Sequence, residues 1–328
     1  MADLRTNYMG IELRNPVIIG SSGLTNSVEK LINLEKAGAG AVVLKSLFEE
    51  QIAHEIQKTV SQNESNISYP EANDYISQYS KENDVANYLK LIREGKSAIN
   101  IPLIASINCV SSSEWISFAK RIEDAGADAL ELNIFVLPSD PHRSAEKNEK
   151  VYFDVAMAIV KEMKIPVALK ISHYFSGLAK TALKLSWTGI KGMVLFNRFF
   201  SPDINIDKFE VTPSHVFSSP EELALSLRWV AMLSDRLHCD IAASTGVHSG
   251  TAVVKQMLAG AKAVQVASAI YKNGNEVIGE MTNFLEYWMD KHGFKTTNEF
   301  IGKMSFKEAE NPAAYERVQF MKHFSGIE

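Results

Sequence analysis

A short pattern of residues recurs along the chain and limits its fold more than any other feature. In each copy an amphipathic helical stretch ends at a glycine, which readily adopts the left-handed conformation that terminates a helix. A short apolar run follows, with the length expected of a strand buried on both faces. The four copies cover residues 37–45, 125–133, 189–197 and 259–267. The chain therefore repeats a helix-to-strand unit.

Further apolar runs complete this pattern. Each follows a proline or begins at an aspartate, and they cover residues 16–20, 102–107, 166–171 and 240–244. Eight strands separated mostly by helical patterns predict a (β/α)8 TIM barrel of the α/β class, because right-handed crossovers can close such a sheet on itself. A doubly wound open sheet is the alternative. Against it, no Gly-x-Gly-x-x-Gly turn follows the first strand, and the chain contains no Walker-type phosphate loop.

The chain is longer than a minimal barrel, and its length of 328 residues leaves room for added segments. We expect a single barrel domain over residues 1–328, with 305–328 as an extra C-terminal tail. Long inserted loops are typical of lids or binding loops, and both predicted ones follow a strand. One addition is an N-terminal hairpin at the barrel floor, at residues 3–15. The second is a loop after strand two, at residues 47–100, which contains a helix near 83–96. The third is a β-ribbon after strand six, at residues 201–220.

Composition excludes several classes of protein. With 34 basic and 39 acidic side chains the formal net charge is −5, which argues against a nucleic-acid binder. Cys109 and Cys239 are too few for a cysteine-ligated iron–sulfur cluster or a disulfide scaffold, and no metal site is predicted. No stretch approaches the roughly 20 apolar residues of a membrane span. We therefore expect a soluble, cytoplasmic protein with no membrane or nucleic-acid partner.

Polar side chains stand where several predicted strands end, which is the face on which barrel enzymes keep their sites. Lys45, Asn133, Lys170 and Asn197 would share one mouth there. A lysine buried at such a position needs an anion or an acceptor-rich partner.

The last two strands end in small residues, Thr245-Gly246 and 267–269, directly before helices. This arrangement predicts a phosphate cradle, because backbone N–H groups and helix N-termini favour anions. The alternative is that these are ordinary turn and cap residues.

These segments resemble the dihydroorotate dehydrogenase family, particularly its soluble class 1 branch, whose members are FMN-dependent (β/α)8 barrels. The resemblance covers roughly residues 5–305. It includes the family's Asn-Pro and Ser-Gly opening, its Gly-Ala-Gly-Ala and Lys-Ser motif, its Glu-Leu-Asn, its lysine strand, its Thr-Gly turn and its closing Phe-x-Gly-Lys. In this sequence these stand at 15–23, 38–46, 131–133, 168–170, 244–246 and 299–303. Each piece is short, but the pieces occur in order at the expected strands.

The resemblance implies FMN as cofactor and assigns roles to individual residues. Lys170 would place its cation near the N1/O2 edge of the flavin, where negative charge collects on reduction. The implied substrate residues are Lys45, Asn66, Asn133 and Asn197. The implied cofactor residues are Ser21, Gly23, Lys45, Ser46, Asn133, Lys170, Asn197, Gly246, Val247, Ala267 and Ser268.

The chain departs from the family at the catalytic base, which is a cysteine or serine soon after Glu-Leu-Asn. That position falls on Val136 or Leu137, neither of which can accept a proton, and general base catalysis typically contributes about 10²- to 10⁴-fold. Cys109 and His173 are weak substitutes, since a small buried cysteine and a structural histidine explain them as well. The family's glycine-rich run after strand six is replaced by Ser218-Ser219-Pro220.

The leading prediction is an FMN-dependent oxidoreductase of the dihydroorotate dehydrogenase type. It would transfer hydride between flavin and a small planar substrate, such as a dihydropyrimidine, and would use a diffusible electron acceptor. Class 1 relatives imply a homodimer. Two alternatives stay open: a non-catalytic or sensory barrel that keeps an FMN or phosphate ligand, and a flavin-free lyase with Lys45 or Lys170 as Schiff-base nucleophile.

Overall fold

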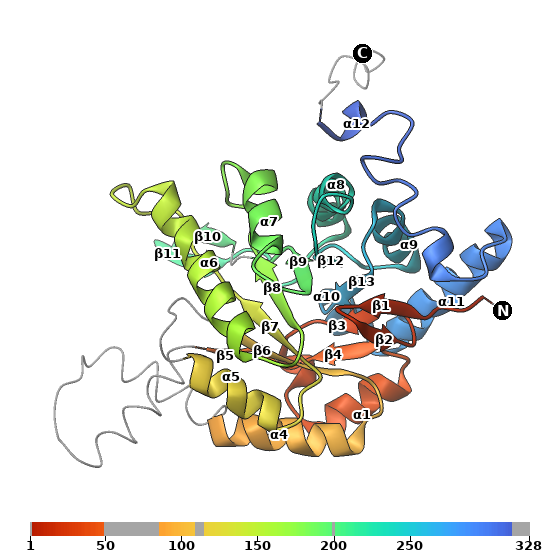
Figure 1. The fold of residues 1–328 in the computed structure, drawn as a ribbon, viewed down its shortest axis with the longest axis horizontal. Coiled ribbons are helices and arrows are strands. Elements are labelled where there is room, and N and C mark those ends of the chain that lie inside the picture. Colours follow the sequence, from red (N-terminus) through yellow and green to blue (C-terminus); the bar gives the residue numbers. More distant parts are fainter. Residues whose placement is uncertain (1, 49–84, 109–114, 199–200, 317–328) are drawn as a thin grey trace.

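Parallel strands close into a barrel in the computed structural model, which describes residues 2–48, 85–108, 115–198 and 201–316 (Figure 1). Neighbouring strands pair in sequence order, and pairing of β4 with β6 closes the ring. A short strand, β5 (Leu47–Phe48), adds to β6. The barrel strands are β3 (Val17–Ile19), β4 (Ala41–Val43), β6 (Leu103–Asn108), β7 (Ala129–Asn133), β8 (Val167–Ile171), β9 (Gly192–Leu195), β12 (Asp240–Ser244) and β13 (Ala263–Val266). The predicted (β/α)8 barrel is confirmed.

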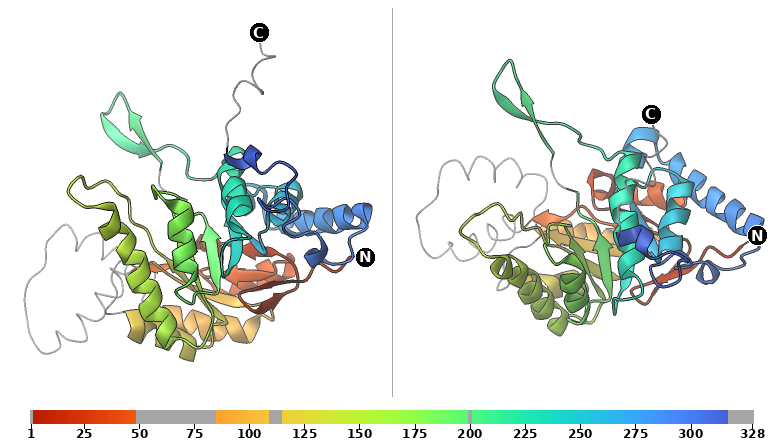
Figure 2. Two further views of the ribbon diagram at one scale, coloured as in Figure 1. Left: turned by 45° about the horizontal axis from the view of Figure 1, so that its top comes forward. Right: turned by 90° about the horizontal axis from the view of Figure 1, so that it is seen from above.

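Helices surround the barrel, as the views in Figures 1 and 2 show. The glycines of the recurring pattern, Gly38, Gly126, Gly189 and Gly260, have φ angles of 106°, 97°, 97° and 117°, as expected where a helix turns into a strand. The α-helices are α1 (Val28–Lys36), α4 (Val85–Ala98), α5 (Trp115–Asp124), α6 (Ala145–Glu162), α7 (Leu178–Ser186), α8 (Leu223–Leu233), α9 (Gly250–Ala259), α10 (Ser268–Asn273), α11 (Glu276–His292) and α12 (Ala313–Glu316). Short 3₁₀ turns are η1 (Gly23–Thr25), η2 (Pro220–Glu222) and η3 (Thr297–Glu299).

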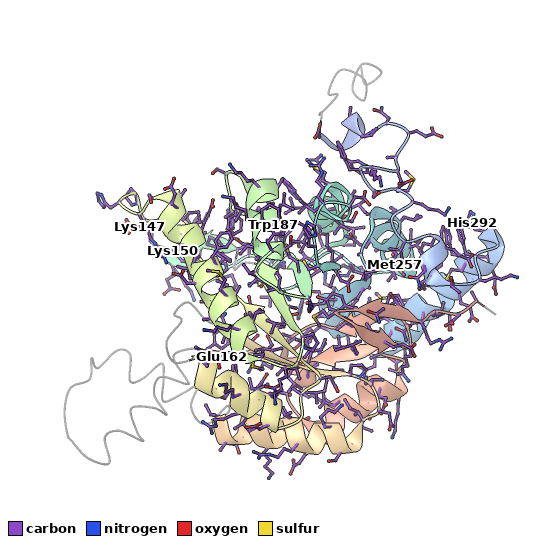
Figure 3. All side chains as sticks on the ribbon, in the orientation of Figure 1. Lys147, Lys150, Glu162, Trp187, Met257 and His292 are labelled. Atoms are coloured by element: carbon purple, nitrogen blue, oxygen red, sulfur yellow. The ribbon has the colours of Figure 1, made fainter. Side chains whose placement is uncertain are left out.

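Figure 3 shows the side chains of the described residues on the ribbon, and labels Lys150, Trp187 and Met257 among others. Met257 of α9 is fully buried between the helices and the strands, whereas Lys150 of α6 and Trp187 beyond α7 stand at the surface. No helix in the described ranges has the length and apolar character needed to cross a membrane.

The N-terminal hairpin plugs the floor of the barrel. Its strands β1 (Thr6–Tyr8) and β2 (Ile11–Leu13) are antiparallel, and Tyr8 and Met9 at its turn are buried against the small side chains that fill the barrel interior. The backbone N–H of Met9 donates to the carboxylate of Asp240, at the start of β12, over 2.8 Å. The predicted hairpin at the floor is confirmed.

The segment after β9 forms the predicted β-ribbon, which projects away from the barrel in both views of Figure 2. Its strands β10 (Pro202–Asn205) and β11 (Glu210–Pro213) pair antiparallel. In the predicted loop after strand two, α4 confirms the helix, and residues 49–84, including Asn66, lie outside the described residues. That residues 1–328 form one domain stays a prediction.

Candidate functional site

A polar cavity opens at the carboxyl ends of the strands, on the face opposite the hairpin. Of the predicted cofactor residues, those that line it are Ser21, Lys170, Asn197, Gly246, Val247, Ala267 and Ser268. Its other walls are Gly20, Arg198, Ser218, Ser244, Thr245, Gln265 and Val266. Four predicted residues stand outside this lining: Gly23, Lys45, Ser46 and Asn133. Two of them contact it, because Ser46 is hydrogen-bonded to Ser21 and Asn133 to Asn197.

Lys170 is the buried cation of the site. Its side chain is held between strands, because Nζ donates to Oε1 of Gln265 over 2.8 Å and lies 3.7 Å from Oε1 of Glu131. The amide of Gln265 in turn donates to the other carboxylate oxygen of Glu131. The expected acceptor-rich partner of the buried lysine therefore comes from β7 and β13. Gln265 received no role from the sequence, although a polar residue inside the apolar run of β13 was a visible signal.

Two further contacts bring predicted residues together. The amide of Asn197, after β9, donates to Oδ1 of Asn133, at the end of β7. Asn133 also lies opposite Lys170 in the register of β7 and β8. On the other side of the mouth, Oγ of Ser21 accepts the backbone N–H of Ser46 over 2.8 Å, and their hydroxyls are 3.0 Å apart. Lys45, adjacent to Ser46, is half-buried.

The loop after β12 makes a tight turn suited to an anion. Thr245 and Gly246 are both left-handed, with φ angles of 75° and 78°. A Cβ on Gly246 would lie 2.1 Å from the backbone nitrogen of Leu223, so only glycine fits there. Small residues, Val247 and Ala267, complete this end of the cavity. The predicted cradle is thus geometrically open to a phosphate, whose binding by backbone N–H groups needs such close approach.

Arg198 was a strand-end residue to which the sequence assigned no role. Its guanidinium donates to the carbonyl oxygens of His215 and Val216 over 2.7 and 2.9 Å, and its Nε donates to Glu222 over 3.0 Å. These bonds fix the segment between the ribbon and α8 against the cavity. Apart from Glu222, the partners are backbone carbonyl groups, for which the sequence carries no signal.

Neither candidate for the family's base position lines the polar cavity. The backbone N–H of Val136 donates to Oη of Tyr152 over 3.2 Å, and its side chain lines a separate, more apolar cavity of about 430 Å³ between α6 and the loop after β8. Leu137 is 49% exposed. The structure gives neither residue a chemical role.

His173 lies at a junction between cavities. It borders the apolar cavity beside Val136 and also a second one that it shares with Asn197 and Arg198. Its Nδ1 is buried without a hydrogen-bond partner among the described residues, and burial lowers the pKa of the imidazole. A neutral imidazole at pH 7 can accept a proton. Cys109, the other candidate, lies outside the described residues.

The residues present fit FMN. A buried ammonium stands at one side of the cavity, and a turn of small residues without side-chain obstruction stands at the other. Within the described ranges, no group of three or more His, Cys, Asp or Glu side chains is placed to hold a metal ion.

The sequence is similar to those of known proteins over nearly its whole length. A sequence profile of the family described as dihydroorotate dehydrogenase matches residues 3–289. The chain is 28% identical over 317 residues to the catalytic subunit of dihydroorotate dehydrogenase B (NAD(+)) from Methanothermobacter thermautotrophicus, covering 91% of this chain and 97% of that one. The corresponding subunit of Thermoplasma volcanium is 27% identical, over 92% of this chain and 98% of that one. The subunit of Methanocaldococcus jannaschii is 25% identical, over 91% of this chain and 97% of that one.

Proposed function

Because the chain belongs to the dihydroorotate dehydrogenase family and is an oxidoreductase of that type, we propose that it binds FMN and oxidises or reduces a small planar substrate. The observation that carries this proposal is Lys170, a buried cation held by Gln265 and Glu131 inside a cavity that ends in a turn of small residues. When bound, FMN would exchange hydride with the substrate at N5.

Each part of the cavity would hold one part of the cofactor. Lys170 would donate to the pyrimidine edge of the ring and stabilise negative charge there. Ser21, Gly23 and Ser46 would flank the ring from the loops after β3 and β4. The phosphate would lie against the backbone N–H groups of Gly246, Val247, Ala267 and Ser268.

The substrate would bind through Lys45, Asn133 and Asn197, joined by Asn66. The hydrogen-bonded pair Asn133–Asn197 presents amide groups suited to the polar edge of a planar ring, such as a dihydropyrimidine. Since Val136 and Leu137 cannot accept a proton, His173 is the group that we assign to this step. It is near Asn197, and its lowered pKa keeps it neutral and competent as a base.

The two alternatives differ in how well the site supports them. A sensory or non-catalytic barrel is favoured by the lost base and would keep the same cofactor. The lyase is disfavoured for Lys170, because its Nζ is engaged by Gln265 and Glu131 rather than free to attack a carbonyl. Borohydride trapping of a carbonyl substrate on Lys45 would support the lyase.

We further propose a homodimer that passes electrons to a diffusible acceptor in the cytoplasm. The ribbon supports the dimer. Its register pairs Ile204 with Val211, and these side chains are 66% and 71% exposed on one face. Asp203 and Thr212 pair on the opposite face. A two-stranded ribbon is marginally stable alone, and an uncovered apolar face of this kind marks an interface.

The first experiment is the visible spectrum of the purified protein, followed by anaerobic addition of dihydroorotate. We expect flavin absorbance that bleaches on addition. Flavin absorbance that persists would retain the cofactor and favour another substrate or the sensory alternative. A colourless protein that takes up no added FMN would contradict the proposal.

A further inference from the structure

Ser218 lies in the segment between the ribbon and α8. It is only 4% exposed, yet it lines the polar cavity beside Gly246 and Ser268. Its backbone is held at both polar groups by the segment that begins α10. The N–H donates to Oγ of Ser268 over 3.0 Å, and the carbonyl accepts from Nζ of Lys272 over 2.8 Å. These contacts fix the backbone of Ser218 and leave the direction of its hydroxyl hydrogen to be set by other partners.

That hydroxyl contacts His248, which follows the phosphate turn. Oγ of Ser218 and Nε2 of His248 are 3.0 Å apart. A neutral imidazole with a lone pair on Nε2 accepts the hydroxyl hydrogen, so the hydroxyl is then engaged by His248, which is not among the residues that line the cavity. A protonated imidazole has hydrogens on both nitrogens and must donate to Oγ. The hydroxyl hydrogen is then released toward other acceptors.

We propose that Ser218 and His248 form a side-chain clamp for the phosphate end of the cofactor, in which protonation of His248 turns the Ser218 hydroxyl into a donor to a phosphate oxygen. His248 acts through Ser218 and adds a positive charge near the anion, so it is a positioning residue. This inference rests on the proposed binding of FMN, and it adds a side-chain contact to the backbone N–H groups of the phosphate turn.

The charges around His248 set the direction of the effect. Lys272 on α10 and Glu221 and Glu222 on η2 are the charged groups that interact electrostatically with it. Burial and the charge of Lys272 lower the pKa of His248, whereas Glu222, a hydrogen bond with the backbone of Ser218 and Glu221 raise it. A phosphate in the cavity adds negative charge and raises that pKa, so by linkage the phosphate binds more tightly where His248 is protonated. Affinity from this contact is therefore present at low pH and is lost as the pH rises.

The test measures FMN binding to the apoprotein by quenching of flavin fluorescence at pH 5.5 and pH 8. FMN titrates over the same range, since a phosphate monoester has its second pKa near about 6. Affinities are therefore compared as the ratio of the Kd of Ser218→Ala to the Kd of the wild type at each pH. If a bound phosphate raises the pKa of His248 by about one unit, we expect a ratio of several-fold, with about ten as its upper limit, at pH 5.5 and about one at pH 8.

Control variants separate the clamp from a structural role. His248→Leu should lose the same pH-dependent part of the affinity, whereas His238→Gln, at an exposed histidine, should behave as wild type. Riboflavin, which lacks the phosphate, should bind wild type and Ser218→Ala equally at both pH values, which also reports that the variant is folded. An equal FMN ratio at the two pH values overturns this inference alone. Failure of the wild type to bind FMN at either pH overturns the proposed function with it.

Discussion

Nζ of Lys170 lies 2.8 Å from Oε1 of Gln265, so a cation from β8 is held by an amide from β13 across the mouth of the barrel. The same amide donates to Glu131, on β7. Three strands thus place one ammonium group, and a buried charge held in this way is preorganised to stabilise charge that develops on a ligand.

Replacing Lys170 with methionine should therefore weaken flavin binding and lower the reduction potential of the bound flavin. A hydrogen bond to a charged group contributes about 1.5–3 kcal/mol, which corresponds to a decrease of about 30–60 mV for a two-electron couple. The measurement is a spectroelectrochemical titration, with Lys161→Met, at an exposed position on α6, as control. An unchanged potential in Lys170→Met would remove this residue from the flavin site.

The barrel could be predicted because its signals are local. Gly38 and Gly126 each end a helix next to an apolar run, and such a pattern specifies both elements without knowledge of their neighbours. The partners of Lys170 could not be predicted in this way. Gln265 is 95 residues away in sequence, and only closure of the barrel brings the two together. Arg198 shows the same limit, since its partners at residues 215–217 are main-chain carbonyl oxygens, which every residue has whatever its side chain.

The pH dependence of flavin reduction tests His173 as the base. Burial lowers the pKa of its imidazole below the ordinary value of 6.5. A base must be unprotonated, so the rate should stay constant from pH 8 down to about 6.5 and decrease only below that value. Stopped-flow reduction by dihydroorotate measures the profile. His173→Asn should lower the rate by about 10²-fold or more, and a variant with the wild-type rate and profile would exclude His173 from this role.

Restoring a thiol at the family's base position should help little. Val136 faces the apolar cavity with Tyr152 rather than the polar one, so the thiol of Val136→Cys would be poorly placed to reach a substrate. We expect less than about a tenfold gain in the rate of flavin reduction, well below the 10²- to 10⁴-fold typical of a positioned base. Leu137→Cys, at the other candidate position, should gain as little, because that residue is 49% exposed. A gain of 10²-fold in Val136→Cys would show that this loop moves over the site.

A pair of glycine substitutions separates backbone strain from the steric demand of the phosphate turn. Gly246 and Gly293 have similar left-handed φ angles of 78° and 76°. A Cβ on Gly293 would meet no atom within 4 Å, whereas one on Gly246 would meet the backbone of Leu223 at 2.1 Å. Gly293→Ala should cost about 1–2 kcal/mol of unfolding free energy, which is the cost of the left-handed conformation alone. Gly246→Ala should cost more and should also abolish FMN binding. Urea unfolding and flavin titration measure the two effects, and equal losses in both variants would contradict the assigned role of this turn.

The last prediction concerns the ribbon. Both of its faces carry cross-strand pairs, but the pair on one face is apolar and the pair on the other is polar. Ile204 and Val211 share the apolar face, and Ile206 and Phe209 near the tip are 77% and 91% exposed. Burying such side chains stabilises an interface by about 1.5–3 kcal/mol each. In a twofold dimer every substitution acts twice.

Replacing both Ile204 and Val211 with asparagine should therefore weaken the dimer by at least about a thousandfold and leave a folded monomer. Asp203→Ala with Thr212→Ala, on the opposite face of the same strands, should leave the dimer intact. Sedimentation equilibrium at micromolar concentration distinguishes the two results. A monomeric wild type, or a dimer that survives the asparagine pair, would move the dimer contact away from this ribbon.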